Sequence, residues 1–428
     1  MRETFRWNPY ADQPHNVATR SERFRRHFRY LGSYFNLVAA NMKKVVPGVS
    51  LYRRYRKQMY KESVHLGHPF ALSLSPVEDR NEDVVSSFLE TGIRQSLVRI
   101  PSWEQDRLPR YDKFINLLWS NNVDVVISLL QQRSDVLDPS GWEDFIDRVF
   151  GQFKERCAFF EIGHAWNRTK WGVWNYKEYL SLARPAFELG QKHGVKLVGP
   201  AVIDFEFHLY PPVLREVPFD KVSALLYVDR VGAPENKQFG WDTSAKIALL
   251  KATVDVCLSE NRDLWITEFN WPLAGTGKYS PASGKPNVTE EEQGNFLVRY
   301  CILALASGFV KRVYWWQLVA PGYGLIDSRE EEWRRRPSYY ALKTMVRMLD
   351  DSTFEAKIPH PQAEVFIFAK GKERFAACWT TGPEVDFHFP EGIKQAIDRD
   401  GNEISICRQS LTLSESPQYI FYKEVKND

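Results

Sequence analysis

Eight short apolar runs alternate with amphipathic stretches between residues 69 and 350, and this alternation limits the folds open to the chain most strongly. The runs predict strands at 70–76, 96–102, 123–130, 158–163, 195–202, 222–228, 264–270 and 310–316. The stretches between them carry helical periodicity, and Gly92, Gly194 and Gly308 stand where helices would end. Eight such units predict an α/β fold, a (β/α)₈ TIM barrel. A doubly wound sheet is the alternative, but its glycine-rich turn is missing after the first run.

Two segments flank the predicted barrel at 69–350. Residues 351–428 contain short alternating runs separated by turns, with a hairpin signal at Asp400-Gly401, and predict a small C-terminal antiparallel β-domain. Residues 1–68 carry fourteen Lys/Arg against four Asp/Glu, whereas the rest of the chain has 43 against 50. The formal net charge of +3 therefore conceals a basic, aromatic N-terminal arm before a mildly acidic body.

The arm is expected to be helical over 21–45, with a second basic and aromatic stretch at 51–60. Five apolar residues follow helical spacing in the first stretch: Phe24, Phe28, Leu31, Phe35 and Val38. Two interpretations stay open. The arm packs on the body as a solvated helix, or it attaches to an anionic membrane surface or an anionic polymer. Nucleic acid is disfavoured because the body is acidic and carries no nucleic-acid-binding motif.

Cellular context is constrained by what the sequence lacks. No apolar run reaches the length of a spanning helix, and the N-terminus has no signal-peptide core. The five cysteines are widely spaced without a C-x-x-C pair, and the histidines are scattered. We therefore expect a cytoplasmic protein, with peripheral contact to the inner membrane as a further option, and neither metal nor cofactor.

The strand ends of the predicted barrel carry planar hydrogen-bonding groups bordered by aromatic rings. Barrel enzymes place their active sites at these C-terminal ends. The residues singled out there are Arg99, Trp103, His164, Trp166, Asn167, Arg168, Trp171, Glu206, Tyr227, Asp229, Glu268, Asn270, Trp271, Trp315, Trp316 and Gln317. Amides, carboxylates and guanidinium groups suit sugar hydroxyls, and aromatic faces suit the C–H side of a pyranose. A carbohydrate is the expected partner.

Two motifs carry a resemblance to a known superfamily. WITEFNWP (265–272) resembles the seventh-strand motif of clan A glycoside hydrolases, and VYWWQLVAPGYGLID (313–327), followed by RPSYYALK (336–343), resembles the eighth. ESPQYIFY (415–422) is similar to the last β-domain strand of family 39-like members. The resemblance implies a retaining (β/α)₈ enzyme in which Glu268 is the nucleophile and a strand-eight tryptophan floors the sugar site. Because side chains alternate, one of Trp315 and Trp316 faces the lumen and the other the core.

The fourth strand departs from the clan pattern E-I-x-N-E-P-N, in which the second glutamate is the acid/base. This chain reads EIGHAWN (161–167), with Ala165 at that position and His164 before it. Retaining hydrolysis needs a second carboxyl group about 5–5.5 Å from the nucleophile, and Glu161 lies too deep in the barrel. Three residues are candidates for the missing acid: Glu206, Asp229 and His164.

Two functions remain open at this point. In the first, the protein is a glycoside hydrolase that acts through Glu268 on a bacterial surface polysaccharide or glycolipid glycan. In the second, it is a catalytically inactive carbohydrate-binding or scaffold protein of polysaccharide or lipopolysaccharide biosynthesis, a use that rests on the resemblance. A redox or phosphate-using barrel is disfavoured, because no glycine-rich phosphate loop follows the seventh run.

Overall fold

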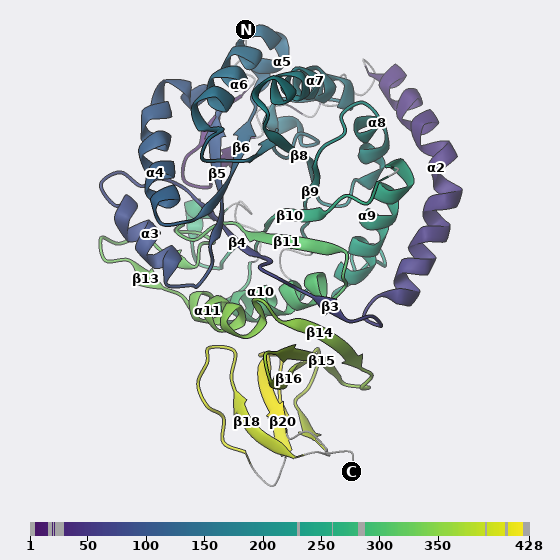
Figure 1. Ribbon diagram of the computed structural model, residues 1–428, viewed down its shortest axis with the longest axis vertical. Coiled ribbons are helices and arrows are strands. Elements are labelled where there is room, and N and C mark those ends of the chain that lie inside the picture. The colour runs from purple at the N-terminus through teal and green to yellow at the C-terminus, as the bar shows by residue number, and fades with distance from the viewer. Residues whose placement is uncertain are drawn as a thin grey trace.

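A closed parallel barrel forms the centre of the molecule (Figure 1). The computed structural model describes residues 5–15, 19, 21, 30–228, 232–258, 260–280, 287–389, 392–406 and 410–422. The barrel strands are β4 (Phe70–Leu74), β5 (Gln95–Pro101), β6 (Asp124–Leu130), β7 (Phe159–Ile162), β8 (Lys196–Ile203), β9 (Lys221–Leu225), β10 (Leu264–Phe269) and β11 (Val310–Trp315). Parallel pairing of β11 with β4, Val313 opposite Phe70, closes the ring. The (β/α)₈ prediction is confirmed.

Helices cover the outside of the barrel. They are α3 (Asn81–Leu89), α4 (Leu108–Ser120), α5 (Arg133–Leu137), α6 (Pro139–Phe153), α7 (Tyr176–His193), α8 (Tyr210–Leu214), α9 (Thr243–Cys257), α10 (Glu290–Leu305) and α11 (Pro337–Leu349). Local sequence sets their ends. The Asn175 side chain caps α7 by accepting from two backbone amides, and Gly194 ends it with a positive φ. Thr289 and Glu292 form a capping box on α10.

Apolar side chains fill the barrel lumen below the C-terminal ends of the strands, and polar groups occupy the lumen at those ends. The lower layer consists of Ala71, Leu97, Val126, Val198, Trp265 and Tyr314, with Phe159 packed against it. Alternation along β5 then brings Arg99, two residues after Leu97, into the same lumen nearer the strand's C-terminal end. The packed floor thus confines a polar site to the C-terminal mouth of the barrel.

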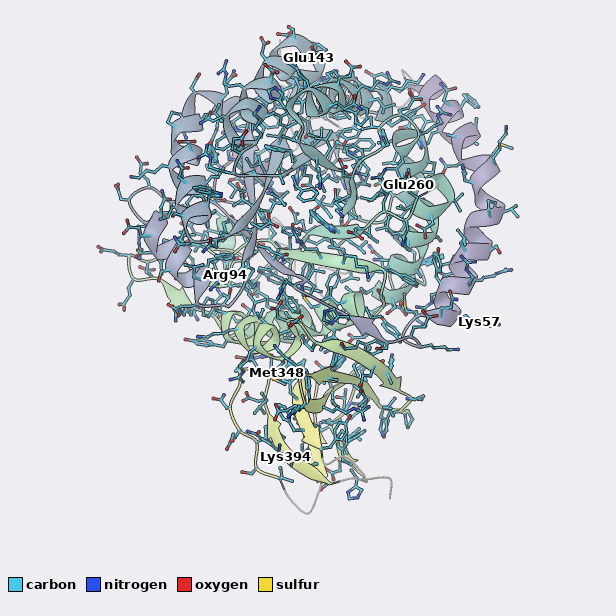
Figure 2. All side chains as sticks on the ribbon, viewed as in Figure 1. Lys57, Arg94, Glu143, Glu260, Met348 and Lys394 are labelled. Atoms are coloured by element: carbon cyan, nitrogen blue, oxygen red, sulfur yellow. The ribbon has the colours of Figure 1, made fainter. Side chains whose placement is uncertain are left out.

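A second β-structure lies beside α11. Its six-stranded sheet has the order β18 (Ile393–Ile397), β20 (Gln418–Tyr422), β16 (Glu373–Thr380), β15 (Ala363–Lys370), β14 (Thr353–Ile358) and β3 (Val64–His65). One face joins the main core through Phe354 and Trp379, and the other packs beneath the two-stranded antiparallel sheet of β17 (Val385–His388) and β19 (Ser410–Leu413). Met348 on α11 lies at the junction (Figure 2).

The chain also contains four short strands and one long helix. β1 (Trp7–Asn8) and β2 (Gln13–Pro14) form a hairpin near the N-terminus, and β12 (Ile326–Asp327) pairs with β13 (Arg334–Arg335). The arm also contains α2 (Leu31–Gln58), one continuous helix that runs along α8 and α9 on the outside of the barrel (Figure 1). No helix in the described ranges combines the length and apolarity needed to cross a bilayer.

Where the structure describes it, at Phe35 and Val38, the predicted apolar stripe of the arm does not pack on the body. Phe35 is 74% exposed and Val38 is 59% exposed. Other residues of α2 make the contacts instead: Leu37 is buried, Lys44 Nζ donates to the Val256 carbonyl, and Tyr55 donates to Asp255. Phe24, Phe28 and the side chain of Leu31 lie outside the described part. The stripe therefore faces solvent where it is described, and the opposite face of α2 holds the helix in place.

Candidate active site

Glu268 is the penultimate residue of strand β10, at the mouth of the barrel, and its carboxylate is nearly buried. Strict alternation after Trp265 would turn Glu268 toward the helices, but the register of β10 shifts between Ile266 and Glu268 against β9. Such irregularities redirect side chains, and Glu268 points into the lumen. Arg99 donates to Oε2 and the Tyr227 hydroxyl donates to Oε1. Both carboxylate oxygens are therefore fixed.

Arg99 links the groups of this site. Its guanidinium carbon lies 3.2 Å from the ring centroid of Trp316, which stacks beneath it. Its Nη2 donates to Glu268 Oε2 and lies 3.1 Å from His164 Nε2, and its Nη1 lies 3.7 Å from Asp12 Oδ2. Burial lowers the pKa of Arg99, and the neighbouring anion Asp12 opposes this effect. Arginine still stays charged, so it places a buried positive charge beside Glu268.

His164 cannot fill the acid role expected of it. Its Nε2 lies 3.1 Å from Arg99 Nη2 and 3.5 Å from Glu268 Oε2. Because arginine only donates hydrogen bonds, His164 Nε2 accepts one and the ring is neutral. Burial lowers the pKa of His164 well below its ordinary value, and the cations Arg99 and Lys170 lower it further. The imidazole therefore orients the guanidinium and carries no proton to donate from Nε2.

The loop after β7 is shaped tightly around Gln131. The Gln131 side chain accepts from the His164 amide and donates to the His164 and Trp171 carbonyls. Gly163 adopts φ +76°, and a Cβ there would lie 2.9 Å from Tyr179, so only glycine fits. Ala165 is fully buried in an apolar cluster that includes Trp171. Aromatic packing therefore occupies the space around the clan's acid/base position.

Glu206 is engaged elsewhere. Its two oxygens accept from Arg168 and from Asn167 Nδ2, and Arg168 also pairs with Asp204. Asn167 in turn bonds the backbone of Ile203 in both directions. Glu206 therefore belongs to a polar cluster that fixes the loop after β8, and its carboxylate does not line the cavity at Glu268. Asp229, the third candidate acid, lies outside the described residues.

Three of the predicted sugar-binding tryptophans belong to the core. Trp166 stacks on Tyr179 with ring centroids 4.4 Å apart and donates to the Pro200 carbonyl. Trp271 and Trp315 stack on each other on the helix side of the barrel, and all three are about 1% exposed. Burial removes them from any ligand. The alternation argument for strand eight is correct, since Trp316 faces the site while Trp315 packs outside.

The remaining predicted residues lie at or near the mouth. A cavity of about 140 Å³ is lined by Arg99, His164, Arg168, Trp171, Tyr227, Glu268, Asn270 and Trp316, together with Ala11, Asp12, Gln13, Lys170, Ile203 and Pro272. Asn270 donates to the Trp316 carbonyl. Gln317 lies just outside and accepts from Ser75. Trp103 packs against Trp7 at 5.2 Å.

The N-terminal hairpin is not predicted by the sequence pattern. Trp7 packs on Trp103 and Trp171, the side chain of Lys170 donates to Gln13, and Asp12 approaches Arg99. β1 and β2 thus reach across the mouth from the start of the chain. The only local signal is the turn-forming Asn-Pro followed by Asp in NPYAD (8–12), which predicts a turn but not its place on the barrel.

Searches against protein-family models and curated proteins found no match. Solved structures do match. A family 39 glycoside hydrolase from the gut symbiont Bacteroides cellulosilyticus WH2 superimposes with a TM-score of 0.66 at 15% identity, over 83% of this chain and 81% of that one. A GH30 endoxylanase from Clostridium papyrosolvens C71 superimposes with a TM-score of 0.57 at 11% identity, over 86% of this chain and 98% of that one. The GH51 arabinofuranosidase from Xanthomonas axonopodis pv. citri superimposes with a TM-score of 0.54 at 13% identity, over 86% of this chain and 96% of that one.

These likenesses, with the closed barrel and the C-terminal β-domain, define a clan A glycoside hydrolase-like fold that resembles family 39. At such low identity the comparison concerns the fold, and the residues of the site carry the argument about chemistry.

Proposed function

We propose that the protein is a retaining glycoside hydrolase with Glu268 as its nucleophile. The observation that carries this proposal is the setting of Glu268. A nearly buried carboxylate lies near the C-terminal end of the seventh barrel strand, with one oxygen held by Arg99 and the other by Tyr227, and it lines a cavity together with Trp316. A fixed carboxylate at the wall of a cavity suits attack on the anomeric carbon of a sugar bound there.

The shape of the mouth favours a terminal sugar over the interior of a long chain. The cavity measures about 140 Å³, and Asp12 and Gln13 of the hairpin line one side of it, while Trp7 packs on Trp171. A polymer threading through the site would meet the hairpin, whereas a chain end can enter. We therefore propose the non-reducing end of a surface polysaccharide or of a glycolipid glycan as the substrate.

A panel of dinitrophenyl glycosides of common sugars tests this function. Their leaving group is a good anion, so turnover does not depend on the identity of the acid. We expect release of dinitrophenolate with at least one sugar and its loss in Glu268→Gln. Glu143→Gln makes the same chemical change at an exposed position on α6 and should behave as the wild type (Figure 2). Absence of turnover across the panel would reject the hydrolase.

A binding protein without catalysis is the second candidate, and Ala165 is the observation that favours it. The position of the usual acid is apolar and fully buried. Such a protein, a scaffold in polysaccharide or lipopolysaccharide assembly, would bind a glycan at Trp316 without turnover. Calorimetric titration should then show saturable binding that Trp316→Ala abolishes, while mass spectrometry detects no cleaved product. Cleavage of the titrated glycan would decide against it.

The membrane surface is a further proposed partner, and the outer face of α2 supports it. Six apolar residues share this face: Phe35, Val38, Met42, Val45, Val46 and Val49. At 100° per residue they fall within an arc of about 100°. All are more than 40% exposed, and the exposed cations Arg53, Arg54, Arg56 and Lys57 follow in the next turns. An apolar stripe beside clustered cations fits an anionic bilayer.

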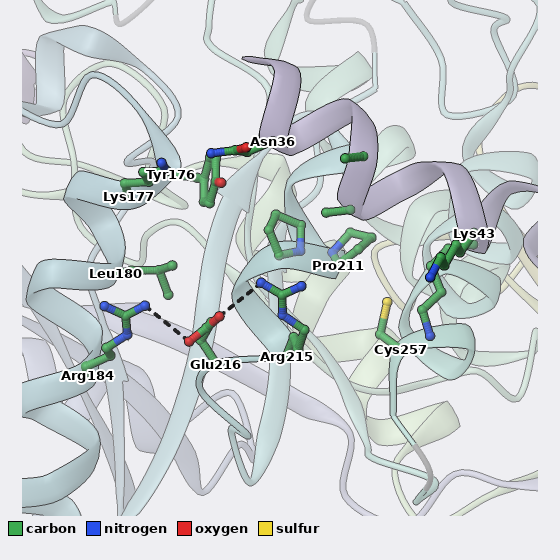
Figure 3. A pocket seen from close by; sticks show the side chains of 14 residues that line it. Asn36, Lys43, Tyr176, Lys177, Leu180, Arg184, Pro211, Arg215, Glu216 and Cys257 are labelled. Carbon is green, nitrogen blue, oxygen red and sulfur yellow. Dashed lines mark hydrogen bonds and ion pairs between the residues drawn. The ribbon is translucent and has the colours of Figure 1, made fainter. Parts of the chain in front are cut away.

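A basic groove adjoins the same helix (Figure 3). It has a volume of about 820 Å³ and runs between α2 and the barrel helices α7 and α8. Five cations line it, Lys43, Lys44, Lys177, Arg184 and Arg215, against one carboxylate, Glu216. Glu216 accepts from Arg184 and Arg215 at 3.1 and 3.0 Å. The surplus of positive charge supports the orientation of α2 toward anionic head groups.

Vesicle sedimentation tests the membrane partner. We expect the full chain to sediment with vesicles containing phosphatidylglycerol, less with pure phosphatidylcholine, and less at high salt. The double variant Phe35→Ser/Val46→Ser should lose this binding, while Ile358→Ser, at an exposed apolar residue of the β-domain, should keep it. Equal sedimentation of all three proteins would reject the role of α2.

A further inference from the structure

The N-terminal hairpin brings a second carboxyl group, that of Asp12, into the cavity that contains Glu268. Asp12 stands between β1 and β2 with φ +49°, a conformation that Asp adopts more readily than most residues. Its Oδ2 lies 3.7 Å from Arg99 Nη1, and Arg99 Nη2 binds Glu268. Asp12 and Glu268 therefore contact the two terminal nitrogens of one guanidinium, from opposite ends of the sequence.

The cavity contains few alternatives. Among the described residues that line it, carboxyl groups occur only on Asp12 and Glu268. Glu206 is held by Arg168 and Asn167 away from the cavity. His164 accepts a hydrogen bond from Arg99 at its Nε2. If the site cleaves ordinary glycosides, Asp12 is the acid that the described geometry offers.

Packing holds the hairpin in this position. Trp7 lies 5.2 Å from Trp103 and 6.0 Å from Trp171 between ring centroids, and Tyr10 lies 5.7 Å from Tyr279. Ala11, beside Asp12, is buried. Aromatic contacts from β1 and from the turn itself thus fix the segment that carries Asp12.

The surroundings of Asp12 suit proton exchange. Its side chain is 31% exposed, so water can reach it, while its inner oxygen faces Arg99. Burial raises the pKa of Asp12 above its ordinary value, Arg99 opposes this effect, and Glu104 adds to it. A general acid needs such a raised pKa so that a proton is present near the operating pH.

We propose that Asp12 is the general acid/base of the glycosidase, supplied by the N-terminal hairpin in place of the residue lost at Ala165. This inference rests on the proposed function. It predicts that two segments more than 250 residues apart, at Asp12 and Glu268, together form the catalytic pair.

The reaction balances with these two groups and water. A Glu268 oxygen attacks the anomeric carbon, the glycosidic C–O bond breaks with its electron pair left on the departing oxygen, and that oxygen takes the Asp12 proton. The alcohol leaves, and the sugar remains as an ester of Glu268. The Asp12 carboxylate then removes a proton from water as its oxygen attacks the anomeric carbon, and the ester electrons return to Glu268.

The test is the dependence of rate on the leaving group in Asp12→Asn. Asparagine also tolerates the left-handed conformation, so the turn is kept. With alkyl glycosides of the sugar that the enzyme accepts, we expect kcat/KM to fall about 10²- to 10⁴-fold. With the dinitrophenyl glycoside it should change less than about tenfold, because that leaving group needs no proton. Asp79→Asn, an exposed aspartate also at positive φ, serves as the matched control.

The outcomes separate the two proposals. An unchanged alkyl glycoside rate in Asp12→Asn overturns the assignment of Asp12 while the hydrolase stands. An equal loss with both leaving groups also overturns it, because a hairpin that merely shapes the site would slow both. Failure of the wild type with every glycoside removes both proposals. Added azide gives a second readout: Asp12→Asn should form a glycosyl azide, since this anion attacks the Glu268 ester without a base.

Discussion

Asp12 and Glu268 contact the two terminal nitrogens of the same buried guanidinium, that of Arg99. This relationship joins the N-terminal hairpin to the seventh barrel strand. It also places a cation between two carboxyl groups that would otherwise repel each other in a partly dry site. Arg99 is therefore expected to matter for folding as well as for turnover.

Arg99→Met removes the cation while keeping much of the side-chain volume. Glu268 is 8% exposed at its side chain, so it would be left as an unpaired buried charge. We expect the free energy of unfolding to fall by about 3–5 kcal/mol, measured by urea denaturation. The double variant Arg99→Met/Glu268→Gln should recover much of this loss. Equal stability of Arg99→Met and the wild type would contradict the ion pair.

Tyr227→Phe removes one hydrogen-bond donor from Glu268. The Tyr227 hydroxyl donates to Oε1, the oxygen that Arg99 does not hold. Loss of one preorganised donor costs on the order of 10²-fold in kcat. We expect that loss with the dinitrophenyl glycoside, with a melting temperature close to that of the wild type. A full rate in Tyr227→Phe would show that the carboxylate does not depend on this bond.

The pH profile of alkyl glycoside cleavage should report Asp12. As an acid it must be protonated, so kcat/KM should fall as pH rises through a pKa above the ordinary 3.8 of aspartate. The groups that set this pKa come from several elements: Arg99 on β5 lowers it and Glu104 raises it. Four further titratable groups are near Asp12: Tyr111 and Tyr323 interact with it electrostatically, and His164 and Glu268 line the same cavity. Asp12→Asn should lose this alkaline limb. A limb that persists in the variant would assign it to another group.

Ala165→Glu puts a glutamate at the position where the clan pattern has its acid/base. We expect that this variant does not cleave alkyl glycosides faster than the wild type. Ala165 has φ +43° and is fully buried among Trp171, Tyr227 and neighbouring apolar groups. A carboxylate there would be unpaired, and we expect a destabilisation of about 3–5 kcal/mol, as for other uncompensated buried charges. Thermal unfolding and alkyl glycoside assays check this together. A stable and faster variant would show that the space is open after all.

The barrel was predictable because strands and helices place apolar residues at different, recognisable spacings in the sequence. The predicted strand 123–130 is observed at Asp124–Leu130, and the predicted 264–270 at Leu264–Phe269. The ends of the strands were less predictable. The run 222–228 predicts a strand, but the observed strand is Lys221–Leu225, and the residues after it belong to a loop at the site.

The site was predictable only in part. Glu268, Arg99 and Trp316 lie at strand ends that a barrel must bring together. Trp166 and Trp271 also lie at strand ends, but their rings turn toward the helices, and position in sequence does not show that turn. The contact of Asp12 with Arg99 joins residues 87 positions apart without any shared periodicity. Only the folded chain reveals it.

Trapping the glycosyl ester tests the central claim, the nucleophilic role of Glu268, most directly. A 2-deoxy-2-fluoro dinitrophenyl glycoside of the accepted sugar reacts with the nucleophile, and the fluorine slows release of the ester. Peptide mass spectrometry should then find the fluorosugar on the peptide that contains Glu268, with one equivalent of dinitrophenolate released and no label in Glu268→Gln. A label on another residue, or turnover without any label, would contradict the account.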